Sequence, residues 1–176
     1  MSTEPLTVVA PNDAFREAFV AFKSEFVEAG EQDIPGIGPM KDADFTAALR
    51  RCDDEAHGRN LPEGWVPGST FWLVRESRTV IATCNLRHRL NESLKCENGH
   101  IGYSVRPSER RKGYGTQTLA LTLKVARRMG IKRVLVTCDK DNPGSAGVIR
   151  HNGGVLENEV VSKTTGKIVQ RYWIAL

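Results

Sequence analysis

A short basic turn with two glycines carries the clearest chemical signal in this sequence. It runs from Arg110 to Thr116 and reads Arg-Arg-Lys-Gly-Tyr-Gly-Thr. Glycines let a ligand approach the backbone closely, and their own backbone can adopt unusual dihedrals. The first N–H groups of a helix that begins here have no partner within that helix. Such N–H groups favour phosphate oxygens. The turn therefore predicts a pyrophosphate site made of three cations, two glycines and a threonine that can also cap the helix: Arg110, Arg111, Lys112, Gly113, Gly115 and Thr116.

The segments on either side of the turn predict a strand, a turn and a helix in that order. Residues 99–105 have the pattern of a strand, and Pro107 ends it. Apolar residues then recur at helical density up to Met129, and Gly130 stands where a helix commonly ends. In isolation the turn also fits an exposed loop with a solvated run of charge, but this context favours the anion site.

Two better-known phosphate motifs do not fit the same turn. The phosphate loop of nucleotide hydrolases requires a lysine directly after its second glycine, and neither Gly113 nor Gly115 is followed by one. The dinucleotide-binding fingerprint requires a third glycine, whereas Gly115 continues as Thr-Gln-Thr. Both motifs are therefore excluded.

The spacing Arg110-x-x-Gly113-x-Gly115 is similar to the signature [Gln/Arg]-x-x-Gly-x-[Gly/Ala] of the GCN5-related N-acetyltransferases, the GNAT family. Downstream, residues 134–138 look like the next strand, and Asn142-x-x-Ser145 followed by residues 152–154 resembles the family's next helix and its exit. The resemblance covers roughly the second half of the chain. Residues 86–88 together with residues 99–103 also look like a bacterial subgroup of predicted acetyltransferases.

This resemblance implies an α/β fold, with residues 1–176 forming a single domain. It implies a mixed central sheet with splayed central strands, flanked by helices, that binds acetyl-CoA. In such a fold the backbone around Val105 holds the pantetheine arm and the acetyl carbonyl, while the amides from Arg111 through Tyr114 to Thr116 hold the pyrophosphate. Asn142 and Ser145 stand where the family often contacts the cofactor arm.

The catalytic residues are less distinct. Direct acetyl transfer to an amine needs a base and a group that stabilises or protonates the departing thiolate. His100 and Tyr103 on the predicted central strand are the candidates, although a lone strand histidine is also commonly structural. Arg87 and His88 are candidates for binding the acceptor or for pairing with surface acids. Many family members have a tyrosine where this chain has Ile149, and isoleucine cannot donate a proton.

The function implied is an acetyl-CoA-dependent N-acetyltransferase that acts directly on a primary amine of a small molecule or peptide. A non-catalytic acyl-CoA sensor or assembly module is the alternative, because Ile149 replaces the tyrosine and the central strand lacks an obvious carboxylate. The acceptor, the use of longer acyl groups and the choice between a monomer and a homodimer stay open. The N-terminal helices commonly line the acceptor pocket in this family, which makes Glu28, Glu31, Asp33 and Trp65 further candidates.

Composition agrees with these expectations. The net charge is +4 and the basic residues cluster near the turn, where the phosphates of coenzyme A account for them without nucleic acid. No apolar run reaches the roughly 20 residues of a membrane span, and a cytoplasmic location is expected. The four cysteines are dispersed, which predicts no metal and no disulfide, with Cys84 and Cys138 buried and reduced.

The rest of the chain predicts alternating helices and strands. Phenylalanines at helical spacing from Phe15 to Phe26 predict a helix packed on the core, and a second helix is expected over residues 44–56. The remaining predictions are strands over residues 6–9, 70–74, 80–86, 155–161 and 168–174, with a polar loop after the third of them.

Overall fold

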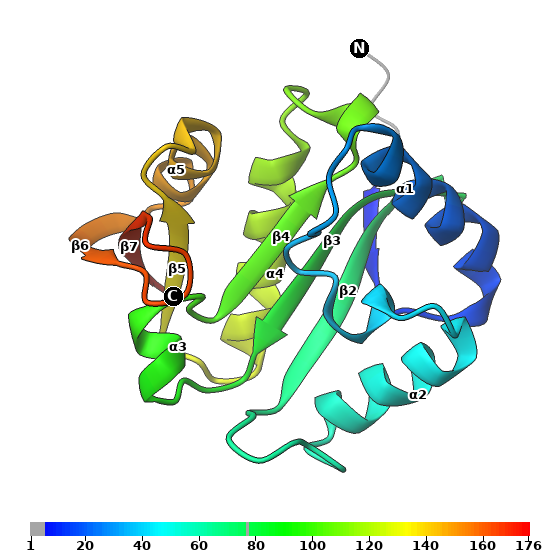
Figure 1. Ribbon diagram of the computed structural model, residues 1–176, viewed down its shortest axis with the longest axis horizontal. Helices are drawn as coiled ribbons and strands as arrows, with labels where there is room; N and C mark the ends of the chain where they lie inside the picture. The colour runs from blue at the N-terminus through cyan, green and yellow to red at the C-terminus, as the bar shows by residue number, and fades with distance from the viewer. Residues whose placement is uncertain (1–5, 77) are drawn as a thin grey trace.

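The computed structural model describes residues 6–76 and 78–176, and its strands form one mixed sheet (Figure 1). The spatial order of the seven strands is β1-β2-β3-β4-β5-β7-β6. The pairing of β4 with β5 is parallel, and every other neighbouring pair is antiparallel. The strands are β1 (Leu6–Val9), β2 (Gly68–Arg75), β3 (Thr79–Arg87), β4 (Ile101–Val105), β5 (Arg133–Asp139), β6 (Val155–Val161) and β7 (Ile168–Ala175).

Helices cover both faces of this sheet, which confirms the predicted α/β class. They are α1 (Arg16–Glu28), α2 (Phe45–Ala56), α3 (Glu92–Cys96), α4 (Tyr114–Arg128) and α5 (Pro143–His151), with short 3-10 turns η1 (Asp13–Phe15), η2 (Gly38–Lys41) and η3 (Pro107–Glu109). Most predicted elements occur within a few residues of their expected bounds. The short helix α3 was missed: Asn91 caps it by accepting a hydrogen bond from the Leu94 amide, within what the sequence predicted to be a polar loop.

The first hydrophobic core lies between α1, α2 and the sheet. Phe19, Phe22 and Phe26 are all buried on one face of α1. The ring of Phe19 stacks on that of Trp72 in β2, with 4.5 Å between the centroids. The aromatic stripe is therefore core, as its helical spacing predicted.

The second core lies on the other face of the sheet, under α4 and α5. Leu119 and Leu123 of α4 and Ile149 of α5 pack with Ile101 of β4 and Tyr172 of β7. Ile149 is fully buried in this core, which explains an apolar residue there. Cys84 and Cys138 are buried and free, as predicted.

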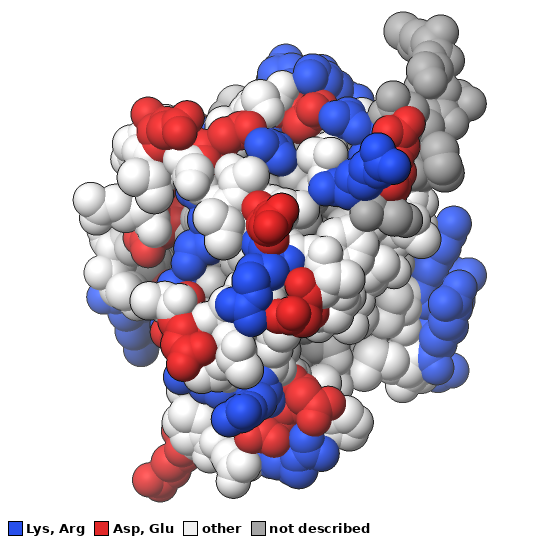
Figure 2. Space-filling model, turned by 90° about the vertical axis from the view of Figure 1, so that its right-hand side faces the viewer, with Lys and Arg blue, Asp and Glu red and all other residues white. Residues whose placement is uncertain are grey.

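The outer face that carries α1 and α2 has mixed charge. Lysine, arginine, aspartate and glutamate side chains are interspersed across the described part of this face (Figure 2). Several form ion pairs, such as Arg16 with Asp13 at 2.7 Å. None of the helices in the described part of the chain is long and apolar enough to cross a membrane.

The parallel strands β4 and β5 separate after a single point of contact. Ile101 pairs with Val136, and the His100 amide donates to the Leu135 carbonyl at 2.7 Å. The other edge of β4, in contrast, pairs with β3 from Ile101 through Val105. The predicted splay of the central strands is therefore confirmed, and it leaves the β5-facing edge of β4 open beyond Ile101.

Candidate functional site

The turn after β4 places the start of α4 at the open end of the splayed strands. Gly113 precedes the helix with φ +85° and no side chain caps its first turn, so Thr116 does not act as the predicted cap. Because the first hydrogen bond at this end runs from the Gln117 amide to the Gly113 carbonyl, the preceding N–H groups lack intrahelical acceptors. The geometry is that of an anion site.

The two glycines of this turn have different roles. Gly113 adopts a left-handed conformation, as does Arg111 with φ +64°. Gly115 lies within α4, so the expectation that it supplies an unusual dihedral is wrong. The missing side chain of Gly115 instead allows α4 to lie close to α5 and β4, because a Cβ there would lie 3.3 Å from Val148 Cγ2 and 3.9 Å from the Tyr103 ring.

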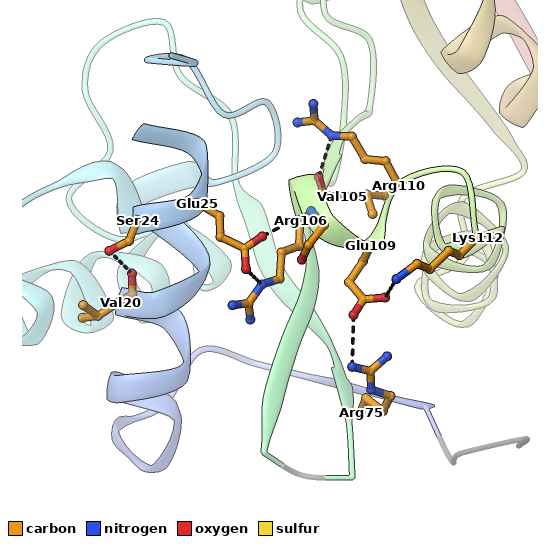
Figure 3. A network of polar contacts seen from close by, with 10 residues as sticks. Val20, Ser24, Glu25, Arg75, Val105, Arg106, Glu109, Arg110 and Lys112 are labelled. Carbon is orange, nitrogen blue, oxygen red and sulfur yellow. Dashed lines mark hydrogen bonds and ion pairs between the residues drawn. The ribbon is translucent and has the colours of Figure 1, made fainter. Parts of the chain in front are cut away.

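The three cations of the turn are also not equivalent, and Figure 3 shows two of them, Arg110 and Lys112. Arg110 forms two hydrogen bonds to the Glu31 carboxylate, at 2.6 and 2.8 Å, and its Nε donates to the Val105 carbonyl. Lys112 pairs with Glu109 at 3.0 Å. Arg111 is exposed and makes no hydrogen bond or ion pair with the described residues. Arg111 is therefore the cation of the turn with its charge still available to a ligand.

Glu109 stabilises the turn from beneath. Its carboxylate is buried and binds both Lys112 and Arg75 of β2. Burial alone would raise the pKa of Glu109, but the hydrogen bonds from Lys112 and Arg75 hold this pKa below its usual value. Next to it, Glu25 of α1 binds Arg106 Nε at 2.6 Å and the Ser108 amide at 3.2 Å (Figure 3). The turn is thus fixed to both β2 and α1.

A cleft of about 340 Å³ lies between the splayed strands, and we call it the strand cleft. Tyr103 lines it, and its hydroxyl lies 2.9 Å from Ser145 Oγ of α5. Burial raises the pKa of Tyr103 to about 12, so its hydroxyl keeps its proton near neutral pH. Cys138 also lines the cleft, and burial raises the pKa of its thiol. Asn142 caps α5 by accepting a hydrogen bond from the Ser145 amide at 3.0 Å.

A second, larger cavity of about 760 Å³ lies among α2, α3 and the ends of β2 and β3, and we call it the large cavity. Both cavities include Gly36 and Arg87 in their walls, so they adjoin at these two residues. Gly36 belongs to the α1–α2 connection, which crosses in front of β3 and β4 (Figure 1). It has φ +76°, and a Cβ on it would lie 2.3 Å from the Gly102 carbonyl oxygen. Only glycine therefore allows this connection to lie directly on β4.

The two predicted histidines lie outside both cavities. His100 Nδ1 accepts a hydrogen bond from the Leu135 amide at 2.9 Å, and its ring packs edge-on against Trp173. Burial, assisted by the charge of Arg87, lowers the pKa of His100 to about 4. His88 Nε2 lies 2.9 Å from Ser69 Oγ. These contacts favour structural roles for both rings, in contrast to Tyr103 and Arg87, which line the cleft.

Gly36 and the large cavity were not anticipated from the sequence. Gly36-Ile-Gly38-Pro predicted only a break between helices, and nothing local indicates that it would meet β4. Of the residues suggested for the acceptor side, Trp65 lines the large cavity, whereas Glu31 binds Arg110 instead. The described residues contain no group of three or more histidine, cysteine, aspartate or glutamate side chains placed to hold a metal ion.

Splayed parallel strands with an open helix N-terminus at the end of β4 define the arrangement of a GNAT-type acyltransferase. The family model of the acetyltransferase (GNAT) domain matches residues 6–155. The chain therefore belongs to the GNAT acetyltransferase family, and both the predicted family and the predicted enzyme class are confirmed. None of the curated proteins compared with this sequence matches it.

Solved structures with the same fold cover nearly the whole chain at low identity. The microcin C7 self-immunity acetyltransferase MccE, in complex with acetyl-CoA and AMP, is 13% identical with a TM-score of 0.71, covering 99% of this chain and 94% of that one. The ribosomal L7/L12 α-N-protein acetyltransferase RimL, in complex with coenzyme A, is 19% identical with a TM-score of 0.69, covering 99% and 96%. A chimera of the spermidine N-acetyltransferase SpeG from Vibrio cholerae is 14% identical with a TM-score of 0.65, covering 97% and 95%.

Proposed function

We propose that this chain is an acetyl-CoA-dependent N-acetyltransferase that transfers an acetyl group directly to a primary amine of a small molecule or peptide. The observation that carries this proposal is the meeting of the strand cleft and the large cavity at Gly36 and Arg87. Two cavities that adjoin in this way allow a donor and an acceptor to enter separately and meet. The described neighbours, which include acetyltransferases of a protein N-terminus and of spermidine, support an amine acceptor.

The residues at the open end of the strands fit coenzyme A. When bound, acetyl-CoA supplies an acetyl group activated as a thioester. We assign its pyrophosphate to the amides from Arg111 to Thr116, with charge from Arg111, and its pantetheine arm to the open backbone edge of β4 near Val105. Asn142 and Ser145 border the same cleft at the start of α5. Two of the neighbouring structures contain acetyl-CoA or coenzyme A, which supports this donor.

Tyr103 is the group that we assign as the proton donor in the strand cleft. The chain has three tyrosines. The hydroxyl of Tyr114 accepts a hydrogen bond from Arg75, and that of Tyr172 is buried against Gln170. Tyr103 is therefore the tyrosine whose hydroxyl reaches the cleft, and Ser145 orients it. Tyr103 can protonate the departing thiolate, which is the role that a tyrosine at the position of Ile149 has elsewhere in the family.

The test is acceptor-dependent release of free thiol from acetyl-CoA across a panel of amines, with acetyl-CoA affinity measured in parallel by calorimetry. An acetyltransferase releases coenzyme A only when an acceptor is present, and mass spectrometry then detects an acceptor heavier by one acetyl group. Tight binding of acetyl-CoA without release by any amine would instead favour a non-catalytic acyl-CoA sensor.

A further inference from the structure

Half of the charged side chains of the large cavity neutralise one another by direct contact. Arg51 pairs with Asp42, and Arg59 pairs with Asp54 at 3.0 Å. The remaining charged residues in the wall are Lys41, Glu55, Glu63 and Arg87. Lys41 and Glu63 are exposed at the surface, whereas Glu55 and Arg87 are partly buried. These last two groups dominate the electrostatics of the interior.

Glu55, in the last turn of α2, has no direct partner in the part of the chain that the structure describes. Its carboxylate makes no hydrogen bond or ion pair with any described residue, although it is half-buried in the cavity wall. Burial raises the pKa of Glu55, and the charges of Arg51, Lys41 and Arg87 oppose this shift from beyond contact distance. A half-buried carboxylate without a partner is costly, so it marks a place where a cation can bind.

Arg87 lies where the two cavities adjoin, and we call this place, between Gly36 and Arg87, the neck. Arg87 lines both cavities, and its guanidinium donates through Nη1 to the Gly99 carbonyl at 3.2 Å. A fixed positive charge disfavours a protonated amine beside it and so increases the neutral fraction of an acceptor amine held there. The neck therefore suits the reacting amine, and Glu55, which lines only the large cavity, suits a charged group farther from the donor.

We propose that Glu55 binds a second cationic group of the acceptor, so that the preferred substrate is a diamine or another amine with two basic groups. This inference rests on the proposed acetyltransferase function and specifies its substrate. The second ammonium forms an ion pair with Glu55 while the first, deprotonated, lies at the neck beside Gly36 and Arg87. A cavity of about 760 Å³ has room for such a molecule.

The experiment compares 1,5-diaminopentane with 1-aminopentane, which has the same carbon chain but only one amine. We expect the wild-type kcat/KM to favour the diamine at least tenfold. Glu55→Gln removes the charge with little change of shape and should abolish this preference by raising KM for the diamine, while the affinity for acetyl-CoA stays within twofold. Glu63→Gln removes the same charge from the exposed rim and should retain the preference.

Each outcome separates this inference from the proposed function. Turnover of both amines without a preference, or a preference that survives Glu55→Gln, overturns the role of Glu55 and leaves the acetyltransferase standing. If no amine is turned over, the proposed function fails. Calorimetry with 1,5-diaminopentane in the presence of coenzyme A then tests whether Glu55 binds a cation. Binding that is lost in Glu55→Gln supports the cation site, and binding that is unchanged in Glu55→Gln, or absent from the wild type, overturns it.

Discussion

The Tyr103 hydroxyl combines two properties that suit a proton donor: burial keeps it protonated, and Ser145 holds it in the strand cleft. We expect Tyr103→Phe to lower kcat about 100-fold while leaving acetyl-CoA affinity unchanged, because the ring stays and only the proton is lost. Steady-state kinetics with the best amine, together with calorimetry, check this. An unchanged kcat would show that Tyr103 is not the acid.

His100 leads to a prediction about stability rather than activity. Its pKa is lowered from 6.5 to about 4, so the unfolded chain binds its proton more readily than the folded chain does. The stability that neutral His100 provides is therefore complete above pH 6.5 and is lost as the pH falls toward 4. We expect a loss of the order of 2 kcal/mol across this range, allowing for partial solvent screening.

The matched variant for this prediction is His100→Asn, which keeps a hydrogen-bond acceptor near the Leu135 amide but does not titrate. Urea unfolding between pH 7 and pH 4 should show a steeper loss of the free energy of unfolding in the wild type than in the variant. Equal slopes would contradict the assignment of this pH dependence to His100.

Residues such as these also show where sequence-based prediction ends. The Arg110 to Thr116 turn was predictable because its chemistry is local: the strand, the glycines and the helix are contiguous. The position of His100 depends on the Leu135 amide, and the pairing of Arg110 with Glu31 joins residues 79 positions apart. Nothing in the local sequence pattern encodes these contacts. Charge and spacing alone therefore made His100 a catalytic candidate and Arg110 a ligand-binding candidate.

At the scale of elements, the crossing of the α1–α2 connection over β4 sets the boundary between the two cavities. We expect Gly36→Ala to destabilise the fold by about 2 kcal/mol more than Gly30→Ala does. Both glycines have similar φ values, +76° and +74°, so the conformational strain is matched. Only at Gly36 would the new methyl group meet backbone, since nothing lies within 4 Å at Gly30. Equal losses in urea unfolding would show that the contact with β4 is unimportant.

Helix α4 allows a test of the proposed cofactor site, with a control in α5 for the added charge. Gly115→Asp would place a carboxylate between Tyr103, Val105 and Val148, close to the amides that we assign to the pyrophosphate. We expect acetyl-CoA affinity to fall at least about tenfold, because like charges repel. Gly147→Asp in α5 adds the same charge where nothing lies within 4 Å, and should change the affinity little. Unchanged affinity in Gly115→Asp, measured by calorimetry, would exclude this location for the pyrophosphate.

Periodicity predicted the elements themselves better than their assembly. The apolar repeats of α1 and α4 mark which side of each helix is buried, because one-sided burial leaves a local pattern. The insertion of β7 between β5 and β6 and the contact of Gly36 with Gly102 are pairings between distant segments. Single-sequence patterns carry no information about such partners, so the large cavity could not be predicted.

At the scale of the whole molecule, ion pairs connect the segment between β4 and α4 to α1 and to the residues that follow α1. Arg106 binds Glu25 within α1 (Figure 3), and Arg110 binds Glu31 just after α1. The same connection continues to Gly36, which rests on β4. A ligand that orders the turn should therefore also restrain the residues between α1 and α2, although they belong to the opposite face of the sheet.

Hydrogen–deuterium exchange with and without acetyl-CoA tests this coupling. At 100 times its dissociation constant, a ligand stabilises the folded state by about 2.7 kcal/mol. We expect slower exchange both at the start of α4 and in residues 29–42. In Glu31→Gln, which weakens the pairing with Arg110, protection at α4 should persist while protection of residues 29–42 decreases. Protection confined to α4 in the wild type would show that donor binding does not reach the acceptor side, and that the two cavities are only neighbours.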